Sequence, residues 1–151
     1  MDAMAKSSTS FEQAYRQTKV FDWLNNGGNI NDPRATKSNH TLLMMACIEN
    51  HEQIVAELLK RKPDIDGKGT GGKNALHLAA IHCNKGCIEL LLKAGARADI
   101  RTVVDDTDYT SYDGMTALEI IEAQLANGKR PRLPEMARML REAEARQAAS
   151  S

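Results

Sequence analysis

Apolar residues recur along the chain in two segments that share one pattern. The segments begin at Thr41 and Asn74, 33 residues apart, and each opens with a short run of apolar and small residues. In each, a second run follows in which apolar side chains are spaced i, i+1, i+4 and i+5, on one face of a helix. These second-run positions are Ile54, Val55, Leu58 and Leu59, then Cys87, Ile88, Leu91 and Leu92. The pattern predicts a repeated unit of a short helix, a turn and a longer helix.

Proline or glycine should end each longer helix, at residues 61–63 and 94–96. Weaker copies flank the clear pair. One covers residues 9–37, and another opens at Asp113, with a second helix from about Pro134. We therefore expect disordered ends at 1–8 and 148–151 and a repeat domain over 9–147. Its units are expected at 9–37, 38–70, 71–103 and 113–147, with residues 103–113 inserted.

The period of 33 residues, together with residues 74–80 and 88–99, resembles the ankyrin repeat. The resemblance implies an all-α solenoid of about four helix-turn-helix repeats joined by β-turn fingers. Its first helices would line a concave face, and this face and the fingers would together form the surface that binds other proteins. It also implies a structural role for His77, whose imidazole would hydrogen-bond the adjoining turns. The chain departs from the family pattern at Leu42 and Met44 and at Cys83, where a glycine is usual.

Carried over by position, the resemblance places candidate partner-binding residues on the turns and the first-helix surface. They are His40, Ile48, Glu49, Lys73, Ile81, His82, Tyr109, Tyr112, Asp113 and Met115. Ile48 and Ile81 have two interpretations: an exposed apolar patch on consecutive repeats, or side chains packed against the neighbouring repeat.

The inserted segment 103–113, here called the acidic finger, carries four aspartates interleaved with Tyr109 and Tyr112. Tyrosine provides large contact area at low rotamer cost, and clustered carboxylates attract a basic partner. A role in recognition is therefore predicted, with a solvated insertion of no functional importance as the alternative.

Two short patterns offer chemical alternatives to the binding role, a phosphate-binding loop and a zinc site. Residues 67–73 satisfy the glycine and lysine spacing of a phosphate-binding loop, but Asn74 replaces the hydroxyl residue that would bind magnesium. Cys83 and Cys87, with His77 and His82 nearby, could be imagined as zinc ligands. Core and turn roles explain these residues better, so we expect no metal, no cofactor and no catalytic set.

Charge and composition narrow the choice of partners. The 151 residues carry 20 basic and 20 acidic side chains, which does not favour nucleic acid. The longest apolar run, 42–48, is too short to span a membrane, and the first eight residues lack an apolar signal core. Three sparse cysteines suit a reducing compartment.

We therefore expect an intracellular protein, cytoplasmic or nuclear. A basic bias over 129–146 is interpreted as the outer face of a capping helix, with a partner contact as the alternative. Head-to-tail pairing of this segment with the acidic finger is a further possibility, although a monomer is expected.

The sequence predicts a non-catalytic protein-interaction module acting as an adaptor, scaffold or inhibitor. The alternative is a nucleotide-binding protein that uses residues 67–73.

Overall fold

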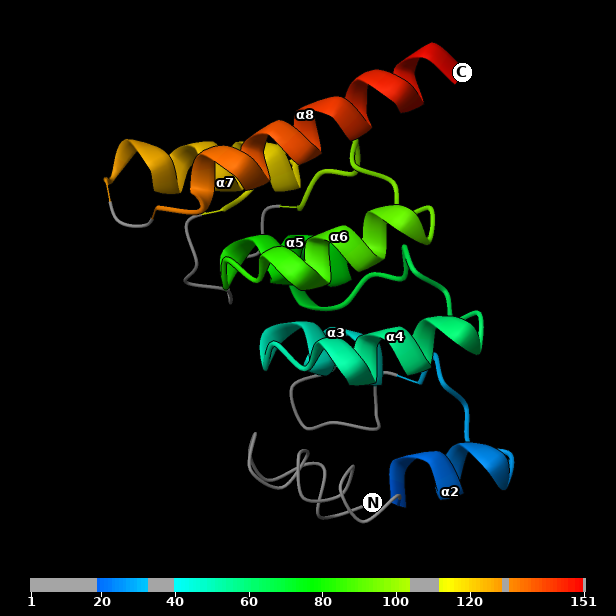
Figure 1. Cartoon of the computed structure of the whole chain (residues 1–151). Coiled ribbons are helices and arrows are strands. Elements are labelled where there is room, and N and C mark those ends of the chain that lie inside the picture. The colour runs from blue at the N-terminus through cyan, green and yellow to red at the C-terminus, as the bar shows by residue number, and fades with distance from the viewer. Residues whose placement is uncertain (1–18, 33–39, 104–111, 129–130, 151) are drawn as a thin grey trace.

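The computed structural model describes residues 19–32, 40–103, 112–128 and 131–150. In these ranges the regular structure is helical, and the helices stack in pairs along the chain (Figure 1). Helix α2 (Lys19–Asn25) lies at the amino-terminal end, followed by the pairs α3 (Leu42–Ile48) with α4 (Glu52–Lys60) and α5 (Ala75–Ile81) with α6 (Lys85–Lys93). The last pair is α7 (Ala117–Ala126) with α8 (Leu133–Ser150). The predicted all-α solenoid is therefore confirmed.

The stack has two layers. The first helices α3, α5 and α7 contact one another in order, and the second helices α4, α6 and α8 form the other layer. A single apolar core runs between the layers, built from aliphatic, methionine and alanine side chains. Leu58, Leu91 and Leu140 on the three second helices are each fully buried. This arrangement is what the i, i+1, i+4, i+5 spacing predicts, because each second helix has one apolar face.

The same position begins each first helix. Thr41, Asn74 and Thr116 are N-cap residues, and the side chain of each accepts a hydrogen bond from the backbone N–H three residues later. These bonds satisfy amide groups that a helix leaves unpaired at its start. A shared cap therefore sets the helix boundaries from repeat to repeat, including the one that begins with Asn74.

Among the residues that the structure describes, three other than glycine take a left-handed backbone where helices end. Asn50 and Cys83 follow the first helices with φ of 58° and 56°, and Lys62 follows α4 with φ of 53°. At the position equivalent to Lys62 in the next repeat, Gly95 has φ of 95°. The left-handed turn is thus present in both repeats, although only one of them has the glycine that this backbone favours.

The last helix corrects one expectation. A disordered tail was predicted for residues 148–151, but α8 continues through Ser150. Its carboxy-terminal part is rich in alanine, glutamate and arginine, which favour helix even without a partner. No helix of the described residues is long and apolar enough to cross a membrane. The predicted first helix of the first repeat and the disordered segment 1–8 lie outside the described residues.

Candidate protein-interaction surface

One column of apolar side chains crosses the three first helices. Ile48, Ile81 and Ala123 occupy equivalent positions of α3, α5 and α7, and each is half-buried. Both isoleucines pack against the apolar core with part of their surface. The structure therefore lies between the two interpretations of these residues: they support stacking and still leave some apolar surface accessible.

Polar residues follow this column by one position. Glu49 is half-buried and His82 is exposed. The third member, Gln124, has a structural role, because its Nε2 donates to the carbonyls of Ala80 and Ile81 at 3.1 and 3.3 Å. Its Oε1 accepts a hydrogen bond from the thiol of Cys83. The surface formed by Ile48, Glu49, Ile81, His82 and Ala123 is called the first-helix face below.

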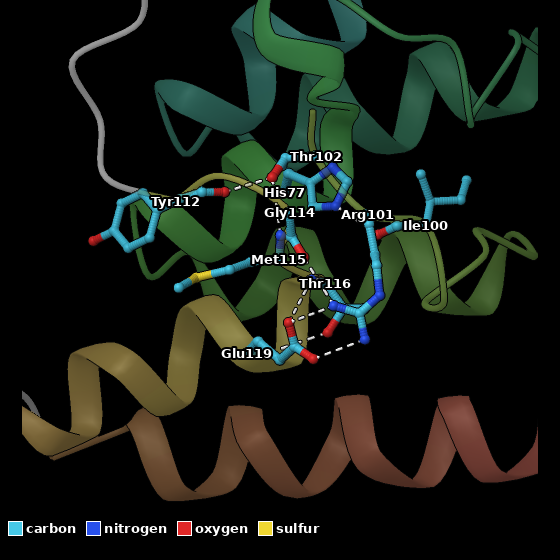
Figure 2. Close-up of polar contacts among 9 residues, drawn as sticks. All are labelled: His77, Ile100, Arg101, Thr102, Tyr112, Gly114, Met115, Thr116 and Glu119. Atoms are coloured by element: carbon cyan, nitrogen blue, oxygen red, sulfur yellow. Dashed lines mark hydrogen bonds and ion pairs between the residues drawn. The ribbon is translucent and has the colours of Figure 1, made fainter. Parts of the chain in front are cut away.

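The base of the acidic finger is closed by Thr102 (Figure 2). Its hydroxyl donates to the carbonyl of Tyr112 and accepts from the N–H of Met115 at 3.0 Å, while its own N–H donates to the carbonyl of Met115 at 3.0 Å. Thr102 is only 4% exposed. These bonds hold the two ends of the insertion together, so Tyr112 and Met115 have defined places beside the core.

An ion pair ties the same region to α7. The guanidinium of Arg101 donates to both carboxylate oxygens of Glu119, at 2.8 and 3.0 Å, and to the carbonyl of Gly114 at 2.8 Å (Figure 2). This hydrogen bonding lowers the pKa of Glu119, which also accepts from the N–H of Thr116 in a capping box. The pair spans the insertion, since its members are 18 residues apart.

His77 has the structural role that the resemblance implied. Its Nδ1 accepts the N–H of Asn74 at 3.1 Å, so the other nitrogen, Nε2, carries the proton and donates to the carbonyl of Ile100 at 2.8 Å. Burial is the main cause that lowers the pKa of this imidazole. A neutral histidine therefore connects the start of α5 to the next turn.

Lys73 corrects another expectation, because it was predicted at an accessible turn tip and is only 4% exposed. The surrounding loop also lacks the features of a phosphate site. Within the loop, the N–H of Gly69 donates to the carbonyl of Lys73. The N–H groups of Gly72 and Lys73 donate to the carbonyls of Gly69 and Thr70, respectively. Amides used in this way are not available to cradle a phosphate, and the Asn74 side chain caps α5. The nucleotide-binding alternative therefore has no support from this loop.

The remaining predicted residues lie just before the first helices α3 and α7. His40 and Met115 are half-buried, Tyr112 is half-buried against the core, and Asp113 is exposed. Tyr109 lies outside the described residues. Val103, the first residue of the acidic finger, was not singled out as a candidate; it is 51% exposed, and its N–H donates to the carbonyl of Gly71 at 2.9 Å.

The imagined zinc site is not supported. Cys87 is fully buried in the apolar core, while Cys83 bonds Gln124. Among the residues that the structure describes, no group of three or more histidine, cysteine, aspartate or glutamate side chains is placed to hold a metal ion.

Stacked helix pairs with a shared cap and hydrogen-bonded inter-repeat turns define a helical-repeat protein. A family model described as ankyrin repeats (3 copies) matches residues 13–102, more than half of the chain. The chain therefore belongs to the ankyrin-repeat family. The pair α7 and α8 lies beyond the matched range and continues the stack.

A curated relative is consistent with this assignment. The chain is 32% identical over 65 residues to a mouse (Mus musculus) protein named "Protein fem-1 homolog A-like". The aligned part is 43% of this chain and 10% of that protein, so the chain matches only a small part of the relative's length. Ankyrin repeats generally mediate protein–protein interaction, and this is the functional class of the repeats found here.

Proposed function

We propose that the chain is a non-catalytic adaptor, scaffold or inhibitor that binds a protein partner through the first-helix face and the acidic finger. The observation that supports this most directly is the column of Ile48, Ile81 and Ala123, repeated on three consecutive first helices. Stacking uses part of each isoleucine, and the accessible remainder lines up beside Glu49 and His82. An apolar strip with a polar margin is the composition expected of a protein contact surface.

The finger supplies the second part of the proposed surface. Thr102 and the Arg101–Glu119 pair fix its base and hold Tyr112 in place, and the exposed Val103 is bonded to the loop that precedes α5. Preorganised residues lose little conformational entropy on binding, which favours affinity. Partner contact by Asp113 and Tyr109 is part of the same proposal.

Affinity capture with three baits tests the assignment of the surface. The baits are the wild type, Ile81→Asp on α5 and, as a matched control, Leu92→Asp on α6. Ile81 and Leu92 are both half-buried, but they lie in opposite layers of the stack. Circular dichroism first establishes that all three are equally helical. Proteins retained by wild type and Leu92→Asp but lost by Ile81→Asp would support the proposal. Equal retention by all three, or loss only with Leu92→Asp, would contradict it.

A further inference from the structure

Two cysteines from different repeats meet in the core. Cys47 lies in the last turn of α3 and Cys87 in the first turn of α6, and both side chains are 0% exposed. The side chain of Asn84, the N-cap residue of α6, donates a hydrogen bond to the carbonyl of Cys47. The thiol of Cys87 contacts Oδ1 of Asn50, just beyond α3, at 3.8 Å. The start of α6 is therefore placed directly on the end of α3.

The two side chains lie close enough to interact. Side-chain hydrogen bonding with Cys87, followed by burial, raises the pKa of Cys47 well above its usual value. The Cys47 thiol is accordingly protonated while the repeats are closed, and a protonated thiol is a poor nucleophile. Both side chains are shielded from solvent. Cys83 takes no part in this contact, because it is half-buried in the turn before α6 and bonds Gln124.

We propose that Cys47 and Cys87 are a redox-sensitive pair that a hydroperoxide converts into a disulfide between the second and third repeats. The two S–H bonds are lost and one S–S bond forms, while the O–O bond of the hydroperoxide is reduced to an alcohol and water. The first thiolate attacks the peroxide and becomes a sulfenic acid, which the second thiol then displaces with release of water. Since both sulfurs are buried, oxidant reaches them when the interface between α3 and α6 opens transiently.

The consequence of this reaction is a covalent connection across a repeat interface. The disulfide closes a loop from residue 47 to residue 87, which restricts the unfolded chain. It also prevents the second repeat from separating from the third. Oxidation would thus convert a solenoid that can open at this interface into one that cannot.

Peptide mapping of the oxidised wild type tests the pairing without any substitution in the core. The native, reduced protein is treated with the diazene oxidant diamide, whose N=N bond takes up the two protons and two electrons, and free thiols are then blocked. Trypsin separates the three cysteines onto residues 38–60, 74–85 and 86–93. The expected main product joins 38–60 to 86–93, with Cys83 alkylated. Protein unfolded in guanidinium before oxidation provides the reference for unselective pairing.

The variant Cys83→Ser serves as the matched control, because it leaves one possible disulfide. It should form the same crosslink at a rate within about twofold of wild type, and its melting temperature should rise by about 5 °C or more on oxidation. A main product that contains Cys83 would overturn the proposal. The proposal would also be overturned if Cys47 and Cys87 stayed reduced in the native protein under conditions that pair them in the unfolded protein. A crosslink that left the melting temperature unchanged or lower would overturn it as well.

Discussion

Acidification should weaken the fold through His77. The neutral imidazole accepts the N–H of Asn74 at Nδ1, and protonation would place a second donor against that N–H. Burial, as the main cause, lowers the pKa of His77 from 6.5, the value expected for the unfolded chain. The folded state therefore binds fewer protons than the unfolded state. Stability from this group is fully present above pH 6.5 and is lost as the pH falls towards the lowered pKa of the folded state.

The size of the effect has a physical upper limit. One proton taken up only by the unfolded chain changes the free energy of unfolding by at most about 1.4 kcal/mol per pH unit. The limit is approached between the two pKa values of His77, where the unfolded chain is charged and the folded chain is not. Carboxylates titrate mainly below this range, which leaves a usable window between about pH 7.5 and 5.

Urea unfolding followed by circular dichroism at several pH values measures this dependence. The matched variant is His77→Gln, because glutamine at this N3 position can accept the same N–H in a capping box and does not titrate. The other histidines are common to both proteins, so the difference in slope belongs to His77. Wild type should lose more stability than the variant on acidification. Equal slopes, or a steeper slope in His77→Gln, would refute the reasoning.

Substitutions at three further positions have defined outcomes in urea unfolding. Lys62→Gly should raise the free energy of unfolding by about 1 kcal/mol, since Lys62 is exposed at a φ of 53° that favours glycine; an unchanged or lower value would count against strain there. Thr102→Val should lower it by about 1 to 3 kcal/mol, because both hydrogen bonds of the Thr102 hydroxyl are lost. Thr102→Ser keeps the hydroxyl and should lose less; equal losses would argue against the bonds. Glu144→Gln should stabilise the protein at pH 7, because burial raises the pKa of Glu144 and its Oε1 is buried without a hydrogen-bond partner in the described structure. A raised pKa stabilises the fold below the unfolded pKa of 4.5, and this stabilisation is lost as the pH rises through the folded pKa. The gain in unfolding free energy from Glu144→Gln should therefore shrink towards about pH 4. A gain that stays constant with pH would contradict this cause.

The helix pairs could be predicted from sequence because their signals are local. The apolar spacing in α4 and α6 and the cap residues Thr41 and Asn74 each act within a few residues. The length of α8 is harder to predict, because its last residues lie beyond the expected end of the fourth repeat at residue 147. Helix-favouring residues after Leu140 continue it to Ser150.

The surface was harder to predict because burial there depends on neighbouring turns. Lys73 has the position of an exposed turn residue, yet its loop folds back through left-handed glycines at 71 and 72 and buries it. The pair of Arg101 with Glu119 depends on how the insertion closes, which no local pattern specifies. Half-burial of Ile48 and Ile81 likewise depends on the fit of adjacent repeats.

Titration calorimetry with the captured partner tests the central claim, that the first-helix face carries recognition. The dissociation constant is measured for wild type, Ile81→Asp and Leu92→Asp, all as the full chain. A residue central to an interface contributes about 2 kcal/mol or more, so Ile81→Asp should weaken binding by about 30-fold or more. Leu92→Asp should change the constant by less than about threefold. Equal affinities for wild type and Ile81→Asp, or a larger loss with Leu92→Asp, would contradict the account.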